Sequence, residues 1–123
     1  MMKDMLTCGI VGIGVSDGGT MKTGKYVLNE DGQPVICEDV RVWAEWFEHH
    51  PEQRIVARDA VGDDIVVSTV FLGLDHNWSG GPPVLWETMI FGGPDDEYQE
   101  RYTSQEAALA GHATALARVL WRA

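Results

Sequence analysis

The chain has 123 residues, a formal net charge of −10 and 45% hydrophobic residues, among them five tryptophans. A chain of this length can bury its own core, and we expect residues 1–123 to form a single domain. Its acidic charge would repel the phosphates of DNA or RNA, so we expect no direct nucleic-acid binding. No stretch approaches the roughly 20 apolar residues that span a bilayer, and we expect no membrane segment.

Residues 1–24 are rich in glycine and include the apolar run TCGIVGIGV, which we interpret as a strand in an N-terminal extension. The many glycines and the lack of a small-x-small cleavage site argue against a signal peptide. Cys8 and Cys37 form no CxxC or zinc pattern. A Cys8–Cys37 disulfide is one interpretation of the pair, but we favour two buried free thiols in a reducing cytosol.

Two hairpins and a further strand are predicted from apolar runs and turn residues. Residues 25–28 and 35–37 bracket the turn sequence Asn-Glu-Asp-Gly-Gln-Pro, and residues 54–60 and 65–72 bracket Val-Gly-Asp-Asp. Both patterns are typical of hairpins. A last strand is predicted at 84–91, where apolar residues again dominate.

A central helix is predicted over about 39–50. Asp39 can cap its first turn, Pro51 stops it, and His49-His50 can bind the last carbonyl groups. Four apolar residues recur there at helical spacing, namely Val40, Trp43, Ala44 and Phe47.

The clearest element is a C-terminal amphipathic helix over about 104–121. Thr103 and Glu106 have the spacing of a capping box. The predicted inward stripe consists of Leu109, Ala113, Leu116 and Leu120. Together these elements predict an α+β fold with a mostly antiparallel sheet of about five or six strands.

Several familiar site motifs fail when their context is considered. Gly19 and Gly24-Lys25 have P-loop spacing, but Tyr26 follows where magnesium binding needs serine or threonine. Gly12-x-Gly14 precedes no βαβ unit and does not fit a dinucleotide site. No catalytic triad or metal-ligand spacing is recognisable, so we expect no catalytic residue, metal or cofactor.

The loop Asp75-His76-Asn77-Trp78 between two apolar strands is the most unusual stretch. One interpretation is a turn stabilised by Asp75 and Asn77, with Trp78 at the edge of the core. The other is a recognition loop, in which His76 and Asn77 give directional hydrogen bonds and Trp78 stacks on a planar ligand. Turn chemistry alone requires neither histidine nor tryptophan.

Other candidates lie on the following strand and the last helix. Glu87 is an acid among apolar neighbours, so it is expected either to pair with an arginine or to lie at an edge. Arg101 is expected near the free amides at the last helix's N-terminus, where an anion can bind, and His112 lies on that helix's apolar flank. Residues 95–100 are expected to form a solvated acidic connector. The full set of candidate ligand-binding residues is Asp75, His76, Asn77, Trp78, Trp86, Glu87, Phe91, Arg101, Tyr102, Thr103 and His112.

Over about residues 25–119, the chain resembles a family of small proteins encoded by tailed phages and prophages. The resemblance is carried by KYVLNEDGQPV, WAEWFE, VSTVFLGLDHNWSGGPPVLWETMIFGG and YQERYTSQEAALAGH. It implies a phage protein in the bacterial host cytoplasm and brings no established activity with it. In size and setting, the chain is similar to the anti-defence sponges that sequester cyclic ADP-ribose-type signals of the Thoeris system.

Three hypotheses follow. The first is a non-enzymatic, homo-oligomeric binding protein that holds a small nucleotide-derived signal with aromatic residues and local arginines such as Arg101 and Arg58. The second is an acidic interaction protein that mimics DNA and blocks a host protein. The third is a small hydrolase or phosphodiesterase that uses His76 and Asp75 as acid and base, with His112 as a further candidate. We favour them in that order.

Overall fold

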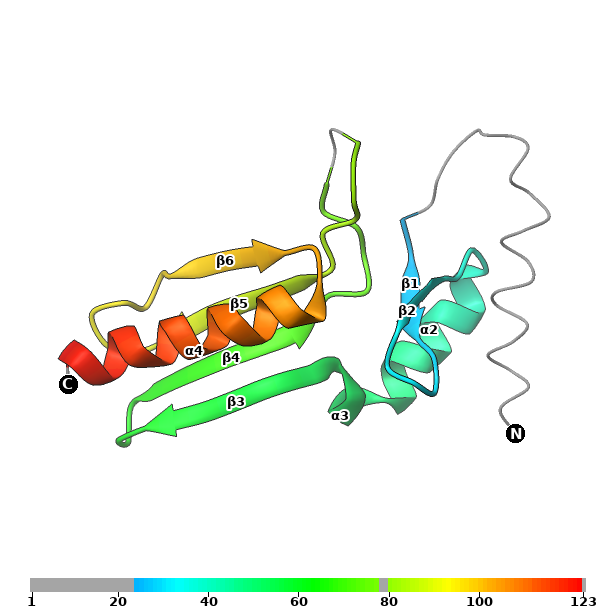
Figure 1. The fold of residues 1–123 in the computed structure, drawn as a ribbon. Coiled ribbons are helices and arrows are strands. Elements are labelled where there is room, and N and C mark those ends of the chain that lie inside the picture. Colours follow the sequence, from blue (N-terminus) through cyan, green and yellow to red (C-terminus); the bar gives the residue numbers. More distant parts are fainter. Residues whose placement is uncertain (1–23, 78–79, 123) are drawn as a thin grey trace.

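A computed structural model describes residues 24–77 and 80–122. They form the expected α+β fold, with a two-stranded sheet, a four-stranded antiparallel sheet and a long helix on one face of the larger sheet (Figure 1). The predicted strand TCGIVGIGV lies outside the described residues. The elements are, in order, β1 (Tyr26–Leu28), β2 (Pro34–Ile36), α2 (Val40–His49), α3 (Pro51–Arg54), β3 (Ile55–Val61), β4 (Ile65–Phe71), β5 (Trp86–Phe91), β6 (Gln99–Tyr102) and α4 (Gln105–Arg122).

The first hairpin, β1–β2, is closed by a turn that one side chain organises. The Asn29 carboxamide oxygen accepts hydrogen bonds from the backbone amides of Asp31 and Gln33, both at 2.9 Å. Cys37, directly after β2, is fully buried and disulfide-bonded, and the other cysteine lies outside the described residues. The expectation of free thiols is therefore wrong for Cys37, because residue type and compartment alone do not show which sulfur atoms meet in space.

Helix α2 follows the predicted boundaries because local signals set both of its ends. The Asp39 carboxylate accepts from the amides of Arg41 and Val42, and Pro51 begins the separate short helix α3. The Nδ1 atoms of His49 and His50 lie 2.9 and 2.8 Å from carbonyl oxygens of the preceding turn, as expected for capping. The inward face carries more aromatic residues than predicted. Val40 and Ala44 are exposed, and the residues that pack inward are Val42, Trp43, Trp46 and Phe47.

The larger sheet has the strand order β3-β4-β5-β6. Both long predicted strand pairs form, and β6 adds an edge strand in which Gln99 lies opposite Met89 and Tyr102 opposite Trp86. The expectation of a solvated connector over 95–100 is therefore wrong in part. Asp95 is buried and binds the Arg118 guanidinium at 2.9 Å, which draws the acidic segment against α4.

Helix α4 packs on the sheet through a row of mostly small residues, Ala108, His112, Ala115 and Val119. The predicted stripe begins one position later, and its members Leu109 and Leu120 are 46% and 56% exposed. Alanines on the buried row let the helix axis approach the sheet closely, which the leucine row would prevent. The capping prediction is also corrected, because the Ser104 hydroxyl, rather than that of Thr103, accepts from the Ala107 amide at 3.0 Å.

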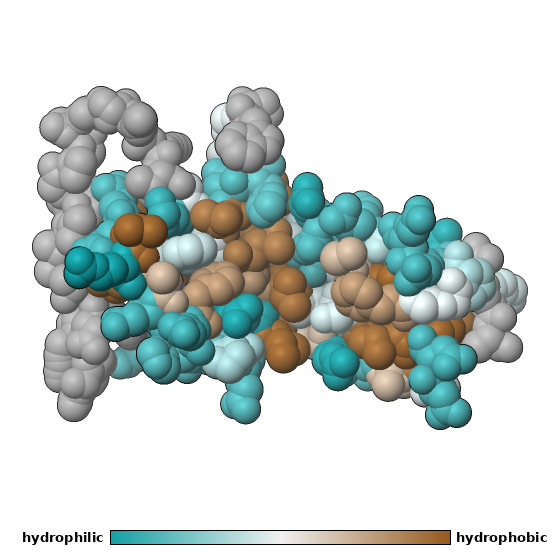
Figure 2. All heavy atoms as spheres, turned by 180° about the vertical axis from the view of Figure 1, so that it is seen from behind, coloured by the Kyte–Doolittle hydropathy of each residue, from teal (hydrophilic) through white to brown (hydrophobic). Residues whose placement is uncertain are grey.

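The core has two clusters, one at each end of the sheet. One joins the β1–β2 hairpin and α2 to Phe71, Leu85 and Trp86, and the other lies between α4 and the strands around Val67 and Ile90. The sheet face opposite α4 carries no helix among the described elements, and Figure 2 shows apolar side chains on this side of the molecule. Phe91 on this face is exposed, as is fitting for an uncovered surface.

Gly111 allows α4 to cross the edge of the sheet. A Cβ atom at this position would lie 2.1 Å from the Tyr102 hydroxyl oxygen and 2.3 Å from its Cζ atom. Replacing glycine by alanine inside a helix normally stabilises it by about 1 kcal/mol. We expect Gly111→Ala to destabilise the protein instead, measured by urea unfolding, and Gly111→Ala in a Tyr102→Ala background to recover the ordinary gain. A stabilised single variant would contradict this packing.

Candidate functional site

The loop after β4 is built on side-chain turns. The Asp75 Oδ1 atom accepts from the amides of Asn77 and Val84, at 2.8 and 2.9 Å, and the Asn77 side chain donates to the Pro82 carbonyl at 2.9 Å. The backbone of His76 also bonds to Val84. Trp78 lies outside the described residues. The polar atoms of Asp75 and Asn77 therefore fix the shape of the loop, which is the first of the two interpretations of this stretch.

The base of this loop lies against β1. Lys25 pairs with Leu74 in an isolated bridge, and the Asp75 amide donates to the Gly24 carbonyl at 2.8 Å. Burial, and secondly the Asp75 carboxylate, raise the pKa of the Tyr26 phenol above its ordinary value of 10.0. The neutral phenol is thus favoured by folding, and its contribution to stability is lost as the pH rises above that value and through the raised pKa.

Glu87 forms an ion pair with an arginine, which was one of the two outcomes expected for an acidic residue in an apolar strand. Its carboxylate is almost fully buried on the open face of the sheet, where it binds the Arg101 Nε atom at 3.1 Å and also accepts from the Gln99 side chain. Arg101 is directly opposite Glu87 in the register of β5 and β6. Adding a bound anion here would require breaking this ion pair, so the pair is better explained as part of the sheet.

We expect Arg101→Leu to destabilise the protein by about 1–2 kcal/mol, because it leaves a buried carboxylate without its charged partner. The loss is smaller than for a fully buried pair, since the arginine side chain is 43% exposed. The double variant Glu87→Leu, Arg101→Leu should recover most of the stability in urea unfolding. A double variant as unstable as the single one would show that the pair contributes something else.

The predicted anion site at the start of α4 is not assembled. Side chains alternate along a strand, so Tyr102, which packs under Gly111 of α4, and Arg101 lie on opposite faces of β6. Arg101 is thereby turned away from the first turn of α4, and Thr103 is exposed between them. The anion site is not formed because residues 99–102 are a strand, which was not predicted from the sequence.

His112 is held in a buried hydrogen-bond network between α4 and the sheet. Its Nδ1 atom lies 2.7 Å from the Thr69 hydroxyl, which bonds to that of Thr88, and its Nε2 atom lies 2.8 Å from Asp59 Oδ2. A neutral ring with its proton on Nε2 satisfies every member: Thr88 donates to Thr69, Thr69 to Nδ1, and Nε2 to Asp59. The hydrogen-bonded sequence Thr69, His112 and Asp59 resembles a nucleophile triad, but Thr69 is fully buried and no substrate can reach it.

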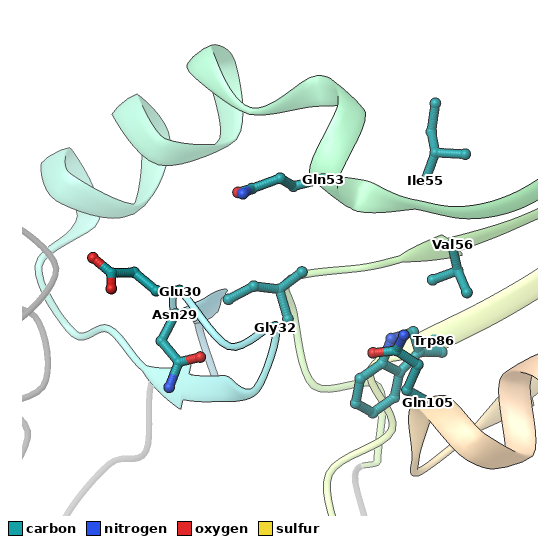
Figure 3. A pocket seen from close by; sticks show the side chains of 9 residues that line it. Asn29, Glu30, Gly32, Gln53, Ile55, Val56, Trp86 and Gln105 are labelled. Carbon is teal, nitrogen blue, oxygen red and sulfur yellow. The ribbon is translucent and has the colours of Figure 1, made fainter. Parts of the chain in front are cut away.

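A cavity of about 200 Å³ lies where the β1–β2 hairpin, α3, the sheet and the start of α4 meet (Figure 3). Leu28, Ile55 and Val56 give it apolar walls. In Figure 3, Trp86 and Gln105 lie together on the side of the sheet and α4, across from the hairpin turn. The polar residues that line it are Asn29, Glu30, Gln53 and Gln105.

Trp86 gives this cavity an unusual donor. The residue is only 3% exposed, and its indole Nε1 atom is buried without a hydrogen-bond partner among the described residues. Buried tryptophan N–H groups usually find an acceptor, and leaving one unpaired costs about 1–3 kcal/mol. A ligand acceptor that reached this N–H group would recover that free energy.

A second hollow, lined by residues 49–53, is a weaker candidate. Its volume of about 380 Å³ is larger, but it is more open to solvent, and the histidines on its wall already bind helix carbonyls. The cavity at Trp86 is the less open of the two and is lined by a residue with an unpaired buried donor, and we take it as the candidate site.

Sequence reasoning found only one residue of this cavity. Trp86 is a candidate for its ring, whereas the sequence places Asn29 and Glu30 in a turn and Gln105 at the start of the last helix, and it assigns Gln53 to no element. These residues are far apart in the chain and meet only through the fold. The remaining candidates are divided among the loop, the open sheet face and the buried network, so they do not form one site.

The sequence matches no protein-family model, no curated protein and no solved structure. Within the described residues, no three histidine, cysteine, aspartate or glutamate side chains are grouped to hold a metal ion. None of the helices in that part of the chain is long and apolar enough to cross a bilayer.

Proposed function

We propose that this protein binds a small ligand without transforming it, and that a planar polar group of the ligand occupies the cavity at Trp86. Two observations carry the proposal: Trp86 lines this cavity, and its N–H group is buried without a partner among the described residues. A ligand oxygen or ring nitrogen would accept from it. Ligand sites typically combine apolar walls with a few placed polar groups in this way.

The size and charge of the cavity restrict the ligand group. Its volume of about 200 Å³ is below the roughly 300–1,000 Å³ of sites that enclose a whole drug-sized ligand. Glu30 is the one charged residue in its lining, which disfavours a phosphate. A neutral nucleobase fits these conditions, because it is planar and offers both acceptors and donors to Trp86 and the side-chain amides. Any phosphate of such a ligand would remain outside.

The proposal keeps the nucleotide-derived signal as the ligand class. Together with the resemblance to small phage proteins, it makes an anti-defence role in the host cytoplasm the working hypothesis, with the protein as a homo-oligomer that sequesters the signal. The role depends on the resemblance alone, whereas the binding site depends on the geometry around Trp86.

Contacts of the described residues weaken the two alternatives. A hydrolase would use His76 and Asp75, with His112 as a further candidate, but Asp75 fixes its own loop and both ring nitrogens of His112 are engaged by Thr69 and Asp59. An acidic mimic would use the patch at 95–100, but within it Asp95 binds Arg118 and Asp96 accepts from the Gly92 amide. Both acidic side chains thus serve the fold.

Calorimetry with adenosine, cyclic ADP-ribose and cyclic di-AMP tests the proposal. We expect at least one to bind, and Trp86→Phe to weaken that binding about tenfold through loss of one hydrogen bond. Trp121→Phe is the matched control, because Trp121 is 89% exposed and lies at the far end of α4. Absence of binding across the panel, or equal losses in both variants, would refute the site.

A further inference from the structure

The flank of α4 beside its buried row carries a second apolar row that the described structure leaves largely uncovered. It consists of Leu109, Ala113, Leu116 and Leu120, and we call it the α4 seam. Leu109, Ala113 and Leu120 are exposed, and Leu116 is half-buried. Next to the seam, Trp121 is 89% exposed. Figure 1 shows α4 in front of the sheet.

The intervals along the seam are four, three and four residues, which is the spacing at which one helix packs along another. The row that contacts the sheet, from Ala108 to Val119, has the same intervals and lies about 100° around the helix. Helix α4 therefore has two apolar rows, of which the sheet buries the first, while in the second only Leu116 packs partly against the core. Leu109 and Leu120, the two ends of the second row, are 46% and 56% exposed and are left for another partner.

The intervals along the seam are the same in both directions, which fits a partner related by two-fold symmetry. If two α4 helices pack antiparallel, Leu109 of one copy lies opposite Leu120 of the other, and Ala113 lies opposite Leu116. Each small residue thus meets a large one, and two large pairs flank the centre. A symmetric dimer requires a surface that is complementary to itself, and this row has that property.

The distribution of charge also favours the α4 seam as the contact between two copies. Two copies that each carry a net charge of −10 repel each other over most of their surface. Residues 107–121 contain no carboxylate, and their one formally charged residue, Arg118, is held by Asp95. The antiparallel arrangement also places opposite ends of the two helix dipoles together. The part of α4 over residues 107–121 is thus nearly uncharged, and two acidic copies can approach each other there.

We propose that a second copy of this chain covers the α4 seam, forming a two-fold symmetric dimer through antiparallel α4 helices. The occupant is a second copy rather than an unrelated helix because the seam is self-complementary and nearly uncharged. This inference does not depend on the cavity at Trp86, because the oligomeric state is measured without any ligand.

Sedimentation equilibrium of the full chain tests the dimer. We expect a dimer for the unaltered protein and at least a tenfold weaker association for Leu109→Glu and for Leu120→Lys. Both side chains are exposed within one copy, so the fold should persist, as checked by circular dichroism. Phe91→Glu, on the open face of the sheet, is the matched control and should remain dimeric.

Mixing the two variants tests the orientation. In the antiparallel arrangement, Leu109→Glu of one copy faces Leu120→Lys of the other, while the second Leu109–Leu120 contact stays native. The mixture should therefore form a heterodimer that neither variant forms alone. A monomeric unaltered protein, a dimer lost only in Phe91→Glu, or monomers that are not rescued by mixing would each overturn the proposal.

Discussion

Replacing His112 by alanine is expected to destabilise the protein by about 3 kcal/mol, one of the two largest effects in this structure. The ring is 5% exposed, and both of its nitrogens bind buried or partly buried partners. Its removal leaves the Thr69 hydroxyl without its acceptor and opens a void under α4. An unsatisfied buried group costs about 1–3 kcal/mol, and a core truncation to alanine costs about 2–5.

Urea unfolding of His112→Ala measures this loss, and Asp59→Ala is its control. Asp59 is the exposed end of the same network, with a side chain that is 49% exposed, so its removal should cost well under 1 kcal/mol. If His112→Ala costs no more than Asp59→Ala, the buried part of the network contributes nothing to stability.

Gly92→Ala is expected to cost about 3 kcal/mol or more, for a backbone reason. Gly92 has a φ of 90°, and a Cβ atom there would lie 2.0 Å from the carbonyl oxygen of Asp64. Left-handed backbone alone costs a residue with a side chain about 1–2 kcal/mol. The clash adds to this, because a backbone carbonyl in the turn between β3 and β4 cannot swing aside as a side chain can.

The matched control is Gly62→Ala, measured in the same unfolding experiment. Gly62 has a φ of 69°, but a Cβ atom there would meet nothing within 4 Å. It should therefore show the conformational cost of about 1–2 kcal/mol without the clash. Equal losses for the two variants would mean that the segment after β5 moves away from the β3–β4 turn at little cost.

Local chemistry explains which parts of the fold could be predicted. Asp39 and Pro51 set the ends of α2 through contacts within a few residues, and the Asn29 turn closes its hairpin in the same way. Strand β6 escaped prediction because Gln99 to Tyr102 is polar at three of four positions. Its pairing with β5 depends on contacts that are remote in sequence, including the Glu87–Arg101 ion pair.

The prediction of which α4 face is buried was wrong for a different reason. Two apolar rows lie one residue apart on this helix, and periodicity favours the row with more leucine. The structure buries the alanine row, because close approach to the sheet outweighs the larger side chains. The row that periodicity identified is real, and we assign it to a second copy of the chain.

The cavity was beyond sequence reasoning for a third reason. Trp86 could be selected as an aromatic residue, but its unpaired N–H group follows only from the neighbours that the fold provides. Asn29 and Gln105 line the same cavity although 76 positions, 105 minus 29, separate them in the chain. Such a set has no local signature.

The most direct test of the proposed site is the nuclear magnetic resonance signal of the Trp86 indole N–H group. In protein labelled with ¹⁵N, this resonance is assigned by its loss in Trp86→Phe and then followed during titration with adenosine and cyclic ADP-ribose. We expect it to shift downfield and saturate as the ligand accepts its hydrogen bond, while the Trp121 resonance stays in place. A Trp86 resonance that remains unchanged at saturating ligand would contradict the proposed function.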